Sequence, residues 1–252
     1  MRVESSVLFA PKDVYGPCGM FTLGHLILLV IGLIALGVLL YLSKSWSKEE
    51  ISKITKRVAV LVVVLEGIKI GFNFYHGYTW LDAWVPISYC SIFIYALLFV
   101  GFGKGRIYSM GEAYIAGTAT IAGFVFLIFP TTSLMQYPMW HYLSMYSMFF
   151  HIMMMFMGII YIRRLEVSLD RRTFLSFASL YGVFAVFALV INTVTGSNLM
   201  IIREPYNIPI PFLHTLYQRI PWVYTLLAIL TYLLGPYLVT AFWVTKRKRN
   251  DK

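Results

Sequence analysis

Seven long apolar runs constrain this chain more than any other feature of its sequence. A helix needs about 20 predominantly apolar residues to cross the hydrocarbon core of a bilayer. Runs of about that length lie at about 21–42, 58–75, 85–102, 113–129, 142–162, 174–194 and 222–244. Since the runs and their short connections fill the chain, we predict an all-α, polytopic membrane protein. Residues 1–252 would form a single transmembrane domain, a bundle of about seven helices.

Composition and charge placement support this class and predict an orientation. Only 13% of the residues are charged, whereas soluble domains average about 25%. Basic residues gather in the connections 43–57, 103–112 and 163–173 and in the tail after 244, while 76–84 and 130–141 contain none. Cytoplasmic loops carry the excess of Lys and Arg, so we predict an outside N-terminus and a cytoplasmic C-terminus in a multi-pass cell-membrane protein. The formal net charge of +10 is therefore not a nucleic-acid signal, and we expect no nucleic-acid partner.

Polar side chains follow one face of the second run. Glu66, Lys69, Asn73 and His76 have the spacing i, i+3, i+7 and i+10, which places them on one side of a helix. Ionisable groups inside a membrane are costly and usually face the protein interior. The stripe is either a set of polar contacts that hold helices together or the wall of a cavity open to the outer side. Because it reaches the outer end of the run, we favour the cavity and predict a substrate pocket there.

The end of the sixth run adds polar candidates for the same pocket. Asn192 and Asn198 flank Gly196, and their amides could bind a carbonyl or ester group. The same segment is also typical of a helix C-cap followed by a turn. The proline-rich outer connection that follows, 195–220, is either a lid that dips back over the bundle or an ordinary interfacial loop.

Cys90 and His151 are the candidate catalytic residues. Both lie in the outer half of their runs, and a histidine can accept the proton of a nucleophilic thiol and later return it to a leaving group. From the residue types alone, a buried Cys is more often a small apolar side chain, and a membrane His often bonds a neighbouring helix. The two cysteines, Cys18 and Cys90, have no metal-ligand spacing, and we predict neither a metal site nor a cofactor.

Several short motifs occur together in a recognisable order. A proline precedes the cysteine that opens the third run (VPISYCSI), and another ends the fourth run (AGFVFLIFP). The fifth run holds a histidine (MFFHIMMM), the sixth ends in INTVTGSN, and the seventh opens on IPWVY. From about Glu66 onward the chain resembles the YwaF-like integral membrane proteins of bacteria, which are related to an animal family of phospholipid acyltransferases.

This resemblance implies a function and a location. Cys90 would be the nucleophile and His151 its partner, and membrane lipids would be the substrate, in a bacterial cytoplasmic membrane. We therefore predict acyl transfer on a phospholipid or lysophospholipid, with Asn192 or Asn73 stabilising the oxyanion and Glu66 with Lys69 orienting the pocket. The alternative is a non-enzymatic transporter or binding protein for a small amphiphile or solute. Protein partners are not predicted.

Overall fold

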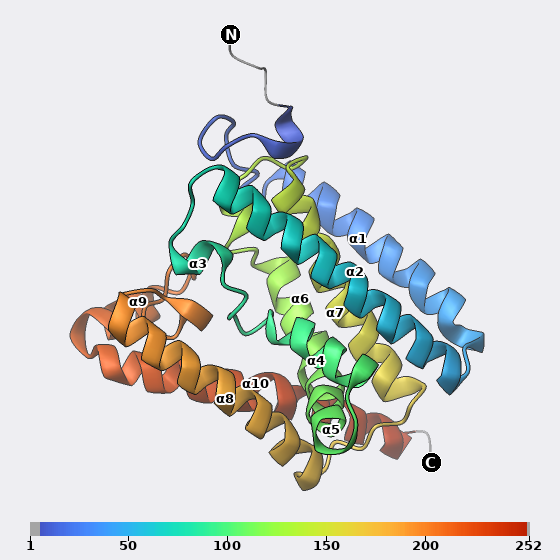
Figure 1. The fold of residues 1–252 in the computed structure, drawn as a ribbon. Coiled ribbons are helices and arrows are strands. Elements are labelled where there is room, and N and C mark those ends of the chain that lie inside the picture. The colour runs from blue at the N-terminus through green and yellow to red at the C-terminus, as the bar shows by residue number, and fades with distance from the viewer. Residues whose placement is uncertain (1–5, 251–252) are drawn as a thin grey trace.

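A computed structural model describes residues 6–250, and within that range all regular secondary structure is helical, with no strand (Figure 1). Residues 1–5 and 251–252 of the predicted domain lie outside the described range. Six helical segments are long and apolar enough to cross a membrane. They are α1 (Leu23–Leu42), α2 (Lys48–Tyr75), a continuous segment from α5 (Gly105–Tyr114) through the π-helical turn η3 (Ile115–Ala119) to α6 (Thr120–Ile128), α7 (Tyr142–Arg163), α8 (Arg171–Thr195) and α10 (Pro221–Asn250). The predicted helical membrane bundle is confirmed.

Capping residues explain why some helices extend beyond their apolar runs. Ser47 and Glu50 form a capping box, which satisfies free N–H groups and starts α2 well before the apolar run at 58. At the start of α8, Asp170 accepts a hydrogen bond from Thr173 N at 2.9 Å. Gly196 ends α8 with φ +75°, a left-handed conformation that glycine adopts without steric cost.

The structure differs from the prediction at the third span. Helix α4 covers only Ile92–Phe102, 11 residues, and residues 85–91 are not helical. Pro86 lacks a backbone N–H and disfavours helix in the residue before it. Ser88 accepts a hydrogen bond from Ser91 N at 3.0 Å, so a local turn replaces the first helical turns.

The segment that contains α4 still traverses most of the bundle. At one end, Asn73 Nδ2 donates to Ala83 O at 2.8 Å, and at the other end Gly101 packs against Lys56. Asn73 and Lys56 are about 17 residues apart on α2, or roughly 26 Å at about 1.5 Å per residue. This is most of the roughly 30 Å hydrocarbon thickness. The third crossing is therefore a non-helical stretch followed by a short helix.

Hydrogen bonds join the connections at one end of the bundle. Cys18 N donates to Tyr137 O at 2.8 Å, and Lys12 N donates to Tyr78 Oη at 2.7 Å. Helix α3 (Leu81–Trp84) is joined to the connection after α8, since Asn198 N donates to Asp82 Oδ1 at 2.8 Å. We call this end outer, following the charge-based prediction. Figure 1 shows η1 (Val7–Phe9) and the end of α10 at opposite ends of the bundle.

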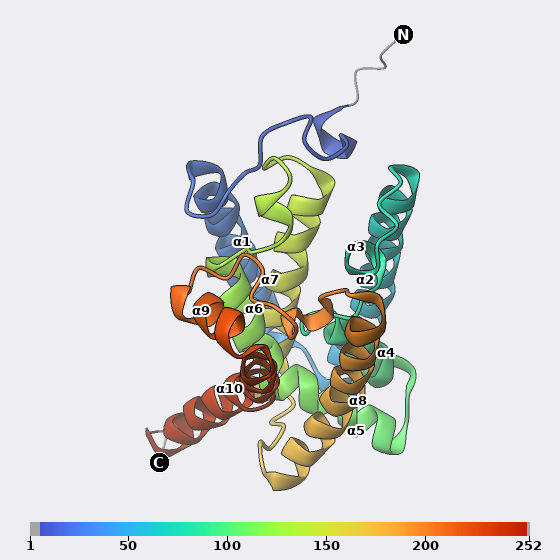
Figure 2. The ribbon, with the colours of Figure 1, turned by 90° about the vertical axis from the view of Figure 1, so that its left-hand side faces the viewer.

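Helix α7 is central, packed against α1, α2 and α6 (Figure 2). The first part of the outer connection after α8 is buried in this core, and its later part lies outside the core. Leu199 and Met200 of η5 (Leu199–Ile201) are buried, as is Ile202. Phe212 of α9 (Pro211–Arg219) is exposed. The first part of the loop thus dips into the bundle, and the second part is an exposed amphipathic helix.

Candidate functional site

His151 lies near the middle of α7 with one ring nitrogen committed and one free. Its side chain is 5% exposed, and its Nδ1 lies 2.7 Å from Ser147 O. A carbonyl oxygen only accepts, so Nδ1 carries the hydrogen and Nε2 carries a lone pair. The Phe126 ring from α6 stacks on the imidazole at 3.6 Å and 6°. Among the described residues, no group bonds Nε2.

Two other buried histidines use both of their nitrogens. His25 Nε2 lies 2.8 Å from Leu127 O, and its Nδ1 accepts from Phe21 N. His141 Nε2 lies 3.1 Å from Ala10 O, and its Nδ1 accepts from Leu143 N. These are structural contacts between distant parts of the chain. Buried polar groups are normally hydrogen-bonded, so the free nitrogen of His151 sets it apart.

Cys90 lies where the non-helical stretch meets α4, at a convergence of aromatic rings. The ring of the preceding residue, Tyr89, stacks on Tyr232 of α10 at 4.9 Å. It also contacts Tyr181 of α8 at 5.9 Å and Tyr114 of α5 at 6.0 Å. Irregular backbone at membrane depth persists only where protein surrounds it, and these rings supply that surrounding.

The structure brings Cys90 and His151 into one aromatic core without a hydrogen bond between them. Phe93 follows Cys90 by three residues, and its ring meets that of Phe150, the residue before His151, at 5.6 Å. The Phe150 ring contacts the His151 imidazole at 5.3 Å. The pair is therefore linked through two phenylalanines within the part of the chain that the structure describes.

The stripe on α2 makes contacts along its whole length. Glu66 pairs with Lys69 at 2.5 Å and accepts from Tyr146 Oη at 2.8 Å. Asn73 is tied to α3 through Ala83 O, and the ring of His76 contacts that of Phe72 at 4.6 Å. These contacts connect α2 to α7 and to α3. The role of the stripe as a substrate pocket stays a prediction.

Asn192, in the last turn of α8, and Asn198, just after the helix, organise the outer loop. Asn192 donates to Leu199 O at 3.0 Å and accepts from Leu199 N at 2.7 Å. Asn198 Oδ1 accepts from the backbone N–H groups of Arg203 and Glu204. The backbone N–H of Asn198 donates to Asp82 Oδ1. Burial raises the pKa of Asp82, and this hydrogen bond opposes that rise. The C-cap interpretation of this segment therefore accounts for these contacts.

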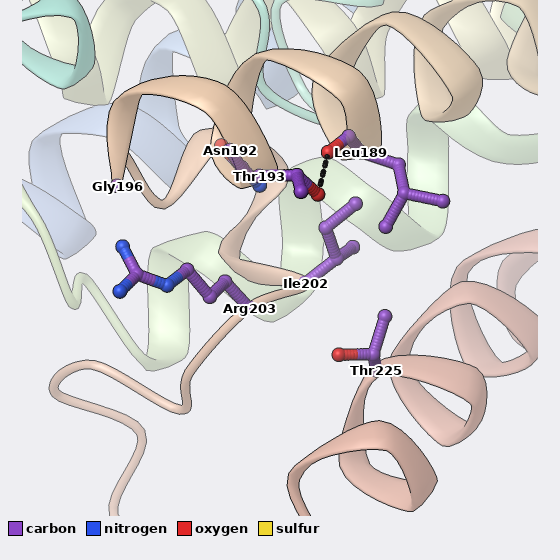
Figure 3. A pocket seen from close by; sticks show the side chains of 7 residues that line it. All are labelled: Leu189, Asn192, Thr193, Gly196, Ile202, Arg203 and Thr225. Atoms are coloured by element: carbon purple, nitrogen blue, oxygen red, sulfur yellow. Dashed lines mark hydrogen bonds between the residues drawn. The ribbon is translucent and has the colours of Figure 1, made fainter.

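Two cavities lie along α8 and α10. The outer one, of about 220 Å³, is lined among others by Asn192, Thr193, Arg203 and Thr225. Figure 3 shows Thr225 on α10 facing Leu189 and Thr193 on α8, with the Arg203 side chain running toward Gly196. The second cavity, of about 250 Å³, is lined by apolar residues and Tyr181. Leu189 lines both cavities.

Sequence reasoning did not select Arg203, Thr225 or Tyr181 as site residues. The signal for Arg203 was present, since a basic residue in a predicted outer connection departs from the charge pattern of the other outer connections. Among the described residues, no three His, Cys, Asp or Glu side chains are grouped as a metal site.

Comparison with known proteins identifies the family. The model of the TMEM164 family matches residues 20–239. The chain belongs to the TMEM164 family. It is thus a multi-pass membrane protein of that family, which agrees with the six apolar helices. The match covers both Cys90 and His151 and does not test the resemblance to YwaF-like proteins or to acyltransferases, which stays a prediction. No curated protein and no solved structure matches this TMEM164 family member.

Proposed function

We propose that this protein transfers fatty acyl groups within the membrane, with Cys90 as nucleophile and His151 as general base and acid. Cys90 Sγ attacks the carbonyl carbon of a phospholipid ester while His151 Nε2 accepts the thiol proton. The ester C–O bond breaks, and the lysophospholipid leaves with the proton from His151. The hydroxyl of a second lysophospholipid, or water, then attacks the thioester while His151 Nε2 accepts its proton. The C–S bond breaks, and that proton passes from His151 to Cys90 Sγ.

The observation that supports this proposal most is the free lone pair on His151 Nε2. A general base needs an available acceptor within reach of the proton it removes, and the bond from Nδ1 to Ser147 O at 2.7 Å holds Nε2 as that acceptor. An unpaired polar atom in a buried site carries a cost of about 1–3 kcal/mol. A functional role explains why the chain accepts it.

The position of Cys90 adds to this support. Discontinuous helices in membrane proteins commonly form binding sites where backbone leaves helical geometry, and Cys90 is in such a place. Cys90 is partly exposed, and a thiol nucleophile reacts as its thiolate, so the proposed reaction needs a base such as His151. Catalytic hydrogen bonds are often long or absent before substrate binds, and a modest displacement of Phe93 or Phe150 would be part of productive binding.

The surrounding polar groups would serve the substrate rather than the thiol. Asn192 and Asn73 each use one amide contact for backbone carbonyls, and each amide has a second N–H for an oxyanion. Glu66 and Lys69 would orient the polar end of the lipid. The bacterial cytoplasmic membrane as the location follows from the resemblance and is part of the proposal.

The test traps the acyl-enzyme. Purified protein in mixed micelles is incubated with a phospholipid that carries a radiolabelled acyl chain, and hydroxylamine-sensitive label on the protein is measured. We expect label on Cys90 in the wild type, none in Cys90→Ala, and a loss of at least about tenfold in His151→Gln, since general bases contribute about 10²–10⁴ in rate. Cys18→Ala, the matched control, should label like the wild type.

The outcome also separates the enzyme from the transporter alternative. A protein that only binds or transports an amphiphile should bind lipid normally in Cys90→Ser and form no thioester in any variant. Label that persists in Cys90→Ala, or that is unchanged in His151→Gln, would refute the proposed mechanism.

A further inference from the structure

The two cavities between α8 and α10 have the form of a lipid site. Both are lined from the same two helices, by Leu189 and Thr225 in the outer cavity and by Leu189 and Ile229 in the inner one. The outer cavity has walls of mixed polarity, with Arg203 and Thr225 beside Leu189 and Ile202, and the inner one is almost wholly apolar. Their volumes are about 220 and 250 Å³, each somewhat below the roughly 300–1,000 Å³ typical of ligand sites, and Leu189 is common to both linings. A polar chamber above an apolar one matches an amphiphile with one headgroup and a chain.

Small residues on α8 create the inner cavity. Ala178, Gly182 and Ala185 line it opposite Ile229 and Leu233 of α10. Small residues at such spacing usually let two membrane helices approach closely. Here the space remains open, and α8 presents exposed apolar side chains beside it, such as Val186 and Leu189. An apolar hollow on a bilayer-facing surface is filled most favourably by an acyl chain.

Arg203 gives the outer cavity its charge selectivity. In the part of the chain that the structure describes, the ion pairs are Glu49–Lys53 and Glu66–Lys69, so no carboxylate pairs with Arg203. Its Nη1 makes one long hydrogen bond, 3.4 Å, to Ser197 O, which leaves most of its five N–H donors available. A guanidinium binds phosphate oxygens bidentately.

The nearby polar groups do not compete for this role. Asp82 lies near enough to interact with Arg203 but is engaged by Asn198 N. The hydroxyls of Thr193 and Thr225 donate to carbonyls of their own helices, so they can only accept. Arg203 is therefore the anion-binding group of the cavity.

We propose that the groove between α8 and α10 binds one membrane glycerophospholipid, with its phosphate on Arg203 and an acyl chain against the small residues of α8. The inner wall of this groove leads toward Cys90, because Tyr181 lines it and its ring contacts that of Tyr89 at 5.9 Å. Delivery of the lipid to Cys90 rests on the proposed function, whereas binding in the groove does not.

The test uses a photoreactive phosphatidylglycerol with a diazirine in one acyl chain, at low mole fraction in phosphatidylcholine nanodiscs that contain the full chain. After irradiation, mass spectrometry locates the cross-link. We expect label concentrated on α8 and α10 around Leu189 and Ile229. Arg203→Gln should reduce it about tenfold, the effect of losing a charge-assisted hydrogen bond. Leu189→Trp, which fills the point shared by both cavities, should reduce it at least as much.

Matched controls make the result specific. Arg219→Gln removes the other arginine of the same outer connection, and Val190→Trp adds the same bulk at an exposed position that lines neither cavity. Both should label within about twofold of the wild type. Label spread evenly over the helices would overturn the proposal. Full labelling of Arg203→Gln with loss of labelling in Leu189→Trp would also overturn it, because the groove would then bind acyl chains without any requirement for the phosphate.

The same experiment separates this site from the catalytic proposal. Cys90→Ala should label the groove like the wild type, even if no thioester forms in any assay. A thioester on Cys90 without labelling of the groove would instead leave the acyl transfer standing and refute the groove.

Discussion

The buried ion pair on α2 offers a quantitative test of what holds this bundle together. Glu66 lies 2.5 Å from Lys69, and the two side chains are 8% and 23% exposed. Replacing Lys69 with Met keeps the length of the side chain and removes its charge, so the Glu66 carboxylate retains only the hydrogen bond from Tyr146. We expect this change to lower the free energy of unfolding.

The magnitude follows from the burial of the two groups. Removing one partner of a buried ion pair costs about 3–5 kcal/mol. Lys69 is partly exposed and Tyr146 still bonds the carboxylate, so we expect about 2–3 kcal/mol. Replacing both partners, Glu66→Gln with Lys69→Met, removes the unpaired charge and should bring the loss to within about 1 kcal/mol of the wild type.

Unfolding by sodium dodecyl sulfate in mixed micelles measures these free energies. The exposed pair Glu49–Lys53, at 2.8 Å with side chains 77% and 62% exposed, is the control. Lys53→Met should cost only about 0.3–0.5 kcal/mol. If the double variant is as unstable as Lys69→Met alone, the charge of Glu66 is not what the lysine compensates, and the reasoning fails.

Two further predictions concern packing and pH. A Cβ at Gly123 would lie 2.6 Å from His151 O, so Gly123→Ala should push α6 from α7 and cost about 1–3 kcal/mol in the same assay, whereas Gly67→Ala, with nothing within 4 Å, should be neutral or stabilising. Burial lowers the pKa of His141, opposed by its hydrogen bond to Ala10 O and reinforced by the charge of His76. The docking of residues 6–22 is thus most stable above the unfolded pKa of about 6.5 and weakens as the pH falls below it. After correction for the pH dependence of the intrinsic exchange rate, the protection factors of this segment should fall from pH 7.5 to 5, and a His141→Gln variant that kept the full decrease would contradict this assignment.

The sequence predicts the class of fold because a single physical constraint dominates it. Apolar length sets the six long helices, and each predicted run lies within its helix or exceeds it by no more than two residues at one end. The same criterion misplaces the start of α4, since residues 85–91 continue an apolar run in the sequence but contain Pro86 and a serine turn. Hydropathy measures partition into the bilayer and not backbone geometry.

The candidate site also combines contacts that helical spacing predicts with contacts that depend on packing between helices. Spacing correctly places Glu66 and Lys69 on one face of a helix, where they pair, but it contains no information on Tyr146, the partner on α7. The free nitrogen of His151 depends on Ser147 within its own helix and on the absence of a partner among the other residues that the structure describes. The second condition is a property of the assembled bundle, and one sequence does not encode it in readable form.

The short α4 has a consequence for how this protein enters its membrane. An 11-residue helix is below the roughly 17–25 residues that insert as an independent span, and residues 85–91 before it have few backbone hydrogen bonds of the helical kind, such as Val85 N to Leu81 O. The insertion machinery would therefore not retain this crossing by itself. We expect this crossing to become stable only once α5 has emerged, because α4 packs against both α2 and α5. The segment that carries Cys90 would then settle in the bilayer later than the helices before it.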